Sequence, residues 1–357
     1  MQLRALALAL LASSVPAVAA ADDTFVAKTQ LYIDNDHTTV VSPLVAATKD
    51  AWRGGTIGVS YVADIVSSAS VDVVSNATPH MSDVRSEAGA SLTQRLRDTT
   101  LSAGYIFSTE NDYTSHNANL SVAQSLFGNN TTLALGGAFS YDAVGRAGDR
   151  AFRRTLVTGA LDATWTQTLT RRLIAQLGYS FLYDDGYQAS PYRFVPVPAL
   201  DGSDATFKVP EALPQLRARH ALVARLNGYL GRESVLQGDA RYYLDEWGIQ
   251  SATVEARYIL TWRSITLRVR ERFYYQSKAD FFHTRYAAIQ PYMTTDRELS
   301  NFWSNLAGVK VAWARPFKRR RLELEAKGDV FYYRYLDFAL LHSRLGGTVE
   351  LGARLDY

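Results

Sequence analysis

The stretch Arg321–Tyr333, RLELEAKGDVFYY, sorts its residues onto two faces with a period of two. Over its first ten positions Arg, Glu, Glu, Lys and Asp alternate with Leu, Leu, Ala, Gly and Val. An α-helix repeats every 3.6 residues and cannot separate the two sets in this way. The stretch is therefore predicted to be a β-strand with one polar and one apolar face.

The end of the sequence repeats this alternation over Arg344–Tyr357. Within it Glu350, Gly352, Leu355 and Tyr357 fall in the order polar, any, Gly, any, any, apolar, any, aromatic. This order resembles the insertion signal of bacterial outer-membrane β-barrels, in which the last strand closes the barrel against the first. The resemblance implies the barrel-assembly machinery as a partner. An edge strand of a soluble sandwich is the alternative for one such strand taken alone.

Segments of about ten residues carry the same alternation through most of the chain, and their connections alternate in length. Short turns are predicted at Trp52–Gly55, Arg97–Thr99, Phe127–Asn130, Leu169–Arg172, Gly231–Ser234, Trp262–Ile265 and Pro316–Arg320. Longer polar loops are predicted at Ser67–Ser86, Thr109–Asn117, Asp142–Arg150, Asp184–Gln215, Glu246–Gln250 and Ser277–Ser300. This pattern predicts a transmembrane antiparallel up-and-down β-barrel of about sixteen strands, with a range of roughly 14 to 18.

A soluble all-β protein is the competing architecture, but here every strand has a single apolar face that only a closed sheet in lipid can accommodate. Aromatic residues lie near strand ends, as expected at a membrane interface: Trp165, Tyr183, Tyr242, Trp262, Trp303, Trp313 and Tyr357. Glu271, Gln124 and Asn305 fall on the apolar face. Because a charge in mid-bilayer costs ~2–4 kcal/mol, we expect a bulge there or a position near a rim.

The amino-terminus has a basic start, an apolar run and small residues, which predict a signal peptide over residues 1–20. Residues 21–357 are then a single barrel domain, located in the outer membrane of a Gram-negative cell after cleavage. The chain has no cysteine, so disulfides and thiolate zinc sites are excluded. A net charge of +3 gives no indication of a nucleic-acid partner. Outer-membrane lipid and lipopolysaccharide are the expected surroundings.

Five phrases resemble a bacterial family of predicted outer-membrane β-barrels that is defined as a domain of unknown function. They are DIVSSASVDVVS (Asp64–Ser75), STENDYTS (Ser108–Ser115), GYQASPYR (Gly186–Arg193), YYLDEWGIQSAT (Tyr242–Thr253) and YYQSKADFF (Tyr274–Phe282). The resemblance implies the fold and location but no activity. The architecture also resembles the outer-membrane component of polysaccharide export systems, which work with a separate periplasmic export protein.

If the apolar faces meet lipid, the charged faces line the lumen. The predicted lumen-lining residues are Arg217, Arg219, Arg225, Asp239, Arg241, Glu255, Arg257, Arg268, Arg270, Arg272, Glu323, Glu325, Lys327 and Asp329. A basic ladder on one wall would orient and select mostly anionic solutes. Alternatively, the charges pair across strands and brace a narrow barrel. About sixteen strands normally leave a water-filled channel, which favours a conduit.

Four aromatic residues, Tyr243, Tyr274, Phe331 and Tyr333, are candidates for either a sugar track in the lumen or a girdle at the rim, and we expect the girdle. The Asp184–Gln215 loop is the longest insertion. It is either an exposed surface loop or an inward constriction in which Arg193 is a candidate gate.

The functional hypothesis is a channel for polar solutes or polymer, with polysaccharide export through a periplasmic partner as its most specific form. The alternative is a plugged scaffold barrel that anchors an envelope complex. A rim enzyme is a third hypothesis, but the six histidines (His37, His80, His116, His220, His283 and His342) accompany no nucleophile motif. We predict no catalytic residues, cofactor or metal.

Overall fold

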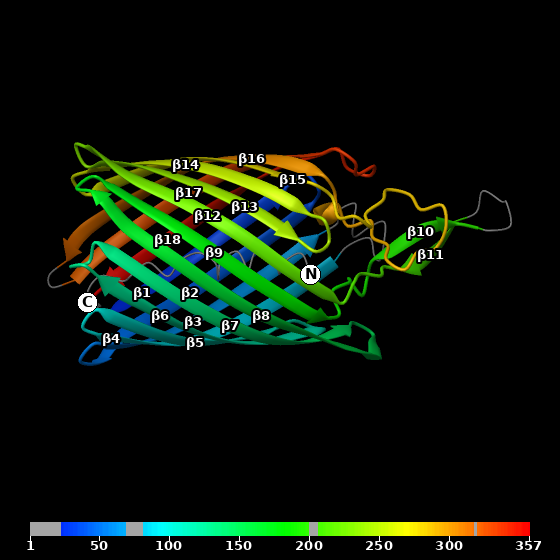
Figure 1. Ribbon diagram of the computed structural model, residues 1–357, viewed down its shortest axis with the longest axis horizontal. Coiled ribbons are helices and arrows are strands. Elements are labelled where there is room, and N and C mark those ends of the chain that lie inside the picture. The colour runs from blue at the N-terminus through cyan, green and yellow to red at the C-terminus, as the bar shows by residue number, and fades with distance from the viewer. Residues whose placement is uncertain (1–22, 69–80, 200–205, 318–319) are drawn as a thin grey trace.

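The computed structural model describes residues 23–68, 81–199, 206–317 and 320–357. The predicted signal peptide lies outside these residues, as do parts of the Ser67–Ser86 loop and of the Pro316–Arg320 turn. Within the described ranges, sixteen strands form one closed antiparallel barrel in which each strand pairs with its neighbours in sequence (Figure 1). The predicted all-β transmembrane barrel and its strand number are confirmed.

The barrel closes where the first strand pairs with the last, and two further strands form a separate hairpin. The barrel strands of the first half are β1 (Thr24–Asp34), β2 (Thr38–Trp52), β3 (Gly55–Ser68), β4 (Met81–Leu96), β5 (Thr99–Thr109), β6 (Tyr113–Leu126), β7 (Thr131–Arg146), β8 (Asp149–Thr170) and β9 (Leu173–Gly186). Those of the second half are β12 (Leu216–Gly231), β13 (Ser234–Asp245), β14 (Gln250–Trp262), β15 (Ile265–Gln276), β16 (Phe302–Phe317), β17 (Arg320–Tyr335) and β18 (Ser343–Asp356). The separate hairpin is β10 (Phe194–Pro198) with β11 (Thr206–Pro210).

One end of the barrel carries short turns, and the residues in them adopt left-handed backbone conformations. Arg232 and Glu233, between β12 and β13, have φ angles of 50° and 57°. Two consecutive positive φ values give a turn whose twist matches that of the flanking strands. Tight turns at this end hold the register of each hairpin, so that the faces stay sorted over the full strand length.

The opposite end carries the longer connections. Two of the loops predicted there are not observed. Thr109–Asn117 and Asp142–Arg150 were expected to be loops, whereas β5 and β6 are separated by three residues and β7 and β8 by two. The strands continue through polar residues because these ends rise beyond the apolar band of the barrel. Polarity alone cannot distinguish such strand ends from loops.

The outer face of the barrel is apolar. Leu120 and Leu161 lie at mid-strand and are 69% and 62% exposed, as expected for side chains that meet lipid. Gln124 lies two residues from the end of β6, near a rim as expected. At Glu271 the expectation of a bulge or a rim position is wrong, because the register of β15 against β14 and β16 is uninterrupted and Glu271 lies near the middle of β15. Instead, the Asn305 amide donates a 2.6 Å hydrogen bond to the Glu271 carboxylate.

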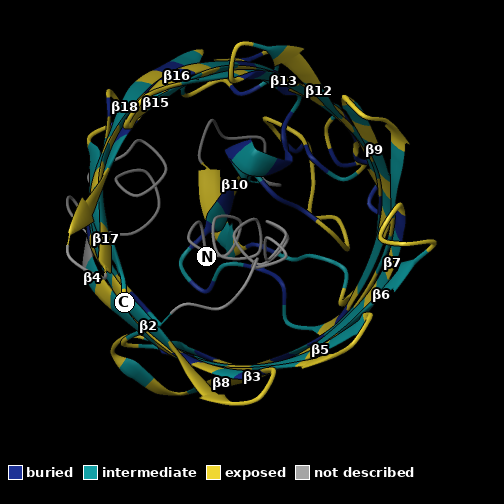
Figure 2. Cartoon of the chain, turned by 90° about the vertical axis from the view of Figure 1, so that its left-hand side faces the viewer, coloured by how far each residue is buried: buried dark blue, intermediate teal, exposed yellow. Residues whose placement is uncertain are grey.

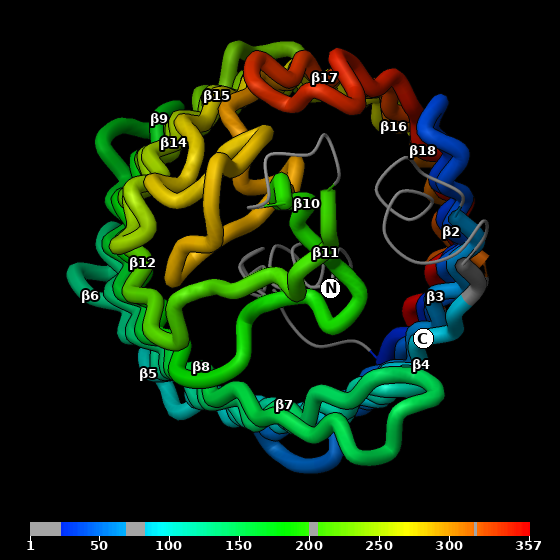
Figure 3. Tube along the Cα trace, turned by 90° about the vertical axis from the view of Figure 1, so that its right-hand side faces the viewer, coloured from blue at the N-terminus to red at the C-terminus, as the bar shows by residue number. Residues whose placement is uncertain are grey.

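Two long segments cover the long-loop end. The β10–β11 hairpin extends beyond the barrel in Figure 1, and in the end-on view of Figure 3 it lies within the ring of strands together with the segment that joins β15 to β16. The second segment contains a three-residue 3₁₀ helix, η1 (Arg297–Leu299). Among the described residues, no helix has the length and apolar character needed to cross a membrane.

Candidate functional site: the barrel interior

The position of η1 identifies the inner face of the barrel. Figure 2 shows this helix inside the ring of strands. The Gln276 side chain on β15 donates 2.9 Å hydrogen bonds to the carbonyls of Glu298 and Ser300, and Arg344 on β18 lies 3.7 Å from the Glu298 carboxylate. Because alternate residues of a strand share a face, the face that carries Gln276 and Arg344 is the lumen face.

All fourteen predicted lumen-lining residues lie on β12 to β15 and β17, and on each strand they share the parity of this inner face. We call the inward-facing side chains of β12–β18 and β1 the charged wall. Most of its charges are paired. The structure therefore contains both arrangements that the sequence allowed. Basic residues are concentrated on one wall, and acidic residues pair with most of them across strands.

Two ion pairs of the charged wall cross an intervening strand above a glycine. Arg270 on β15 and Asp329 on β17 form a bidentate pair with distances of 3.0 and 2.8 Å, and Gly308 on β16 is the register partner of both. Lys28 and Glu325 likewise meet across Gly352 on β18. A Cβ atom at either glycine would collide with the carboxylate-bearing side chain. The pairs can form because Gly308 and Gly352 have no side chain.

A second network joins the barrel strands β12, β13 and β14. Asp239 forms ion pairs with Arg257 at 2.7 Å and with Arg225 at 3.7 Å, while Arg257 also pairs with Glu255. On β15, no ion pair is recorded for Arg268 or Arg272 among the residues that the structure describes. Arg241 on β13, which lies over the Tyr243 ring, likewise has no carboxylate contact among these residues, so the ladder keeps three basic side chains whose charge is not matched by an ion pair.

The opposite wall has a different chemistry. Its inward positions at mid-depth on β4–β9 carry mainly Gly, Ala, Ser, Thr and Asn, and we call this surface the neutral wall. Its residues are Gly89, Ser91, Gly104, Ile106, Asn117, Asn119, Ser121, Gly136, Ala138, Ser140, Ala160, Asp162, Thr164, Gly178 and Ser180. Asp162 is the one carboxylate in this set, and it accepts a hydrogen bond from the Ser180 hydroxyl at 2.5 Å.

Solvent reaches inward-facing side chains on both walls. On the neutral wall Ser121 and Asp162 are exposed although they point away from lipid. On the charged wall, Arg225 and Arg257 retain about a third of their side-chain surface, at 32% and 29%. Side chains buried in a dry core would not retain this exposure. The middle of the barrel is therefore wet.

The mouth, in contrast, is packed. Arg193, the candidate gate, is 8% exposed and lies 3.3 Å from Glu211 and 2.7 Å from Asp296. Thr294 donates a further hydrogen bond to Glu211. Arg193 thus joins the β9–β12 insertion to the β15–β16 segment as an interlocking contact. Its role in a constriction stays a prediction.

A second buried contact ties the β15–β16 segment to the barrel. Arg297 of η1 is 1% exposed and pairs with Asp36 in the β1–β2 turn. Below it, a hydrophobic cluster joins the loops to the inner wall. Its members are Trp247, Ile249, Ala279, Phe282, Leu299, Phe302, Tyr335 and Phe338. This packing holds the segment in place across the strands from β13 to β18.

The four aromatic residues expected in a rim girdle lie on the inner face instead. Tyr243, Tyr274 and Tyr333 pack against the hydrophobic cluster under the loops, and Phe331 stacks on Tyr32 at a centroid distance of 5.4 Å. Arg344 lies over the Tyr333 ring at 4.4 Å. The girdle interpretation is wrong for these residues, because their parity is that of the charged positions on the same strands. They anchor the loops at the mouth.

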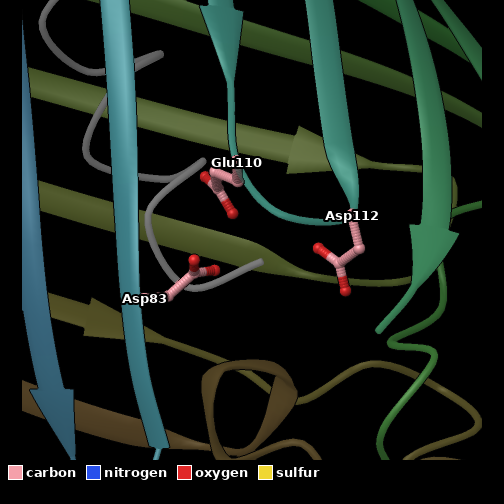
Figure 4. Close-up of side chains that lie close together, drawn as sticks. All are labelled: Asp83, Glu110 and Asp112. Carbon is pink, nitrogen blue, oxygen red and sulfur yellow. The ribbon is translucent and has the colours of Figure 1, made fainter. Parts of the chain in front are cut away.

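An acidic group that the sequence did not reveal lies at the loop rim (Figure 4). Asp83, Glu110 and Asp112 bring carboxylate oxygens within 4.8 Å of one another. Burial, together with the charges of Asp83 and Asp112, raises the pKa of Glu110. Tyr192 donates a hydrogen bond to Asp112, and burial raises the pKa of Tyr192 to about 12. Asp83 lies on β4 and the other two acids in the β5–β6 turn, so no spacing in the sequence identifies the group.

Two of the described histidines lie on the outer face of the barrel. His116 on β6 and His220 on β12 each place the Nδ1 atom against a tyrosine hydroxyl, that of Tyr105 at 2.6 Å and that of Tyr179 at 2.8 Å. His116 lies close to Glu110 in the sequence, but its contacts are with the aromatic residues Tyr105 and Phe107. His80 lies outside the described residues.

Sequence reasoning missed several participants on the inner face. Lys28 on β1 and Lys310 on β16 both pair with Glu325, yet Lys28 is the one cation of its strand and Lys310 shares its strand only with Arg315 near the end. Both lysines lie an even number of residues from polar neighbours in their strands, and this spacing could have identified them as inward-facing. The neutral wall was missed because glycine, alanine and serine give little contrast with an apolar face.

The residues of the predicted insertion signal lie on the closing strand. Glu350, Gly352 and Leu355 pair in register with Gln30, Lys28 and Phe25 of β1. Tyr357 follows the strand and donates its backbone amide to the Asp23 carbonyl at 2.8 Å. The geometry puts the four residues at the barrel seam, and their role in insertion stays a prediction.

Comparison with solved structures shows the same architecture. A structure described as a bacterial polysaccharide outer membrane secretin matches with a TM-score of 0.54 and 9% identity, over 94% of this chain and 98% of that chain. CdiB from Acinetobacter baumannii gives a TM-score of 0.49 at 9% identity, over 94% of this chain and 61% of that chain. OccD3 from Pseudomonas aeruginosa gives 0.47 at 10% identity, over 94% and 91%. At this identity the match to the secretin shows a shared fold alone, and the other two carry no functional argument.

The comparison with curated proteins found no match. The family model described as "Protein of unknown function (DUF3570)" matches residues 19–164 and 153–335. The two matches overlap and together run from residue 19 to residue 335, which is most of the sequence. With the fold of outer-membrane β-barrels and a family match of this extent, the chain belongs to the DUF3570 family.

Proposed function

We propose that the protein is an outer-membrane channel for polar solutes or polymer. The observation that carries the proposal is that inward-facing polar side chains at mid-depth remain exposed to solvent on both walls of a closed barrel, Asp162 and Ser121 among them. Barrels of sixteen to eighteen strands generally enclose an aqueous bore. The packed loops at one mouth then act as a constriction above that bore.

The channel is tested by single-channel recording with the purified protein in planar bilayers. We expect stepwise conductance in symmetric salt, because water and ions can reach both walls. Protein that is shown by protease protection to be inserted, yet conducts at no voltage, would contradict the proposal. That result would favour the scaffold hypothesis, in which Arg193, Arg297 and the hydrophobic cluster close the mouth permanently.

Polysaccharide export is the most specific form of this function. It is supported by the shared architecture with the polysaccharide secretin, which covers nearly all of that chain. A periplasmic export protein would then deliver polymer to the end that carries the short turns. Deleting the gene in its host should reduce surface polysaccharide and leave polymer in the periplasm. Unchanged surface polysaccharide would restrict the proposal to small solutes.

We further propose that the barrel is not an enzyme. Support comes from the contacts of His116 and His220, whose Nδ1 atoms meet tyrosine hydroxyls on the outer face rather than a nucleophile or a carboxylate. Replacing all six histidines should leave conductance and any export phenotype unchanged. Loss of the export phenotype with normal conductance would revive the rim-enzyme hypothesis.

A further inference from the structure

The glycines of the two walls report how much space lies in front of each wall. On β7 and β9 of the neutral wall, the nearest atoms that a Cβ would meet lie 3.8 Å away at Gly136 and 3.7 Å away at Gly178, whereas on β4 and β5 a Cβ at Gly89 would lie 2.6 Å from Ser60 and one at Gly104 2.8 Å from Asn119. On the charged wall, a Cβ at Gly308 would collide with Asp329, and one at Gly352 would lie 2.8 Å from Glu325. Side chains fill the space in front of the charged wall, whereas the surface formed by β6–β9 is open.

One of the two loop segments adds to this asymmetry, whereas the β9–β12 insertion contacts the neutral-wall side at the mouth, where the Tyr192 hydroxyl donates to Asp112 and accepts from the Ala147 amide. Arg344, Gln276 and the hydrophobic cluster attach the β15–β16 segment to strands of the charged wall. The long arginine and lysine side chains of that wall occupy the same side below the loops. Both features shift the free part of the lumen toward β6–β9.

The surface of β6–β9 at mid-depth offers hydroxyl and amide groups with little charge. Asn119, Ser121, Thr164 and Ser180 are neutral donors and acceptors, and Asp162 is the one carboxylate among them. Exchanging water for solute hydroxyls at such groups changes the free energy by only about 1 kcal/mol per hydrogen bond. A hydroxylated solute can therefore move along this surface without being held.

Neither charge nor ring stacking would trap a solute there. Most cations of the facing wall are already paired with carboxylates, which reduces the field that a charged solute would experience. Among the described mid-depth residues of β6–β9, none of the inward-facing side chains is aromatic. The inward rings of Tyr243, Tyr274 and Tyr333 lie under the loops, where they anchor packing.

We infer that the passage is eccentric, running along β6–β9 rather than down the barrel axis, and that it suits an uncharged, hydroxyl-rich solute such as a neutral saccharide chain. The inference rests on the proposed channel function and adds to it a position and a substrate class. Arg268 and Arg272 give the facing wall a residual positive charge, so small anions pass more readily than small cations.

The absence of cysteine from the sequence makes a direct test possible, because each introduced thiol is unique. Ser121→Cys places a thiol on the open inner surface. Leu120→Cys, its neighbour on β6, places one on the lipid face, where Leu120 is 69% exposed. Gln237→Cys places one on the charged wall, where Arg257 reaches toward the Gln237 side chain at 3.5 Å.

Each variant is treated in bilayers with a water-soluble, uncharged maleimide that carries a bulky polyethylene glycol. We expect labelling at Ser121→Cys to lower single-channel conductance by more than half, labelling at Gln237→Cys to lower it less, and Leu120→Cys to show no change. Equal or greater block from Gln237→Cys would overturn the eccentric passage. Failure of the Ser121→Cys thiol to react in a conducting channel would overturn it as well.

The substrate class is tested by solute flux into proteoliposomes. A linear neutral maltooligosaccharide is compared with an oligogalacturonate of equal length. We expect the neutral chain to enter severalfold faster, and faster entry of the anionic chain would overturn the substrate assignment. A protein that conducts no ions in any form would instead overturn the channel itself, so the two failures are distinguishable.

Discussion

The two walls of the barrel are built from the same kind of strands and turns, but one is filled with side chains and the other leaves space in front of it. The charged wall brings long side chains into one compartment and neutralises them in pairs, such as Arg270 with Asp329 across Gly308. The neutral wall uses short side chains and leaves its space open at Gly136 and Gly178. Their difference teaches that glycine has two roles in this lumen. On the charged wall, glycine lets an ion pair cross the strand above it. On β7 and β9 of the neutral wall, glycine leaves the space in front of the strand empty.

The largest expected effect comes from filling the void. Gly136→Trp and Gly178→Trp should each reduce single-channel conductance severalfold, because an indole would project into open space in front of the neutral wall. Gly328→Trp is the matched control, since Gly328 lies on the lipid face of β17 and a Cβ added there would meet nothing within 4 Å. Equal conductance in all three variants would contradict the claim that the space in front of the neutral wall is open.

A second effect concerns ion selectivity. Replacing both Arg268 and Arg272 by Glu should reverse the preference for small anions, because neither arginine has a carboxylate contact among the described residues to cancel its charge. Arg270→Lys is the control, since it keeps the positive charge that faces Asp329. It should change selectivity little and lower stability by about 1–2 kcal/mol, because lysine cannot form the bidentate pair. The reversal potential in a salt gradient measures the first effect and urea unfolding in vesicles the second.

A smaller effect follows from the glycine that carries the ion pair. Gly308→Ala should destabilise the barrel by about 1–3 kcal/mol, because the added methyl group displaces the Asp329 carboxylate from Arg270 and leaves polar groups unsatisfied. Gly328→Ala on the neighbouring strand provides a control with open space around it. A normal unfolding midpoint in Gly308→Ala would show that the pair re-forms around the methyl group.

The smallest effect lies at the rim, where three acids are grouped. The raised pKa of Glu110 means that the folded state holds the proton more tightly than the unfolded state does. Stability contributed by this group therefore falls as pH rises from the ordinary carboxyl range through the raised value. Glu110→Gln should match the parent protein at low pH and exceed it at neutral pH, as measured by hydrogen exchange in the β5–β6 turn. A difference that is independent of pH would contradict this assignment.

The sequence predicted the barrel and its strand number because strands such as Arg321–Tyr333 alternate sharply between charged and apolar residues. It also placed the fourteen charged residues on one parity of their strands. It did not predict the neutral wall, where glycine, serine and alanine alternate with leucine too weakly to define a face. Nor did it predict the mouth, because Arg193, Asp296 and Arg297 make contacts between segments that are far apart in the chain.

The expected bulge at Glu271 shows another limit of pattern reasoning. A carboxylate on the lipid face was expected to require a backbone irregularity or a position near a rim, but Asn305 on the adjacent strand provides a hydrogen-bond donor instead. Such cross-strand partners depend on register. Register is fixed by turns, and turns are the elements whose boundaries polarity marks least reliably.

The seam between β1 and β18 joins residues more than three hundred positions apart, such as Thr24 and Asp356. The free-energy cost of bringing such distant segments together grows only slowly with chain length, but the time needed to find the pairing grows strongly with sequence separation. Until β1 pairs with β18, both edge strands expose backbone amides and carbonyls that have no hydrogen-bond partner in lipid. Assembly of this protein therefore depends on a late, cooperative closure event, and a chaperoning surface that shields the two edges would accelerate it.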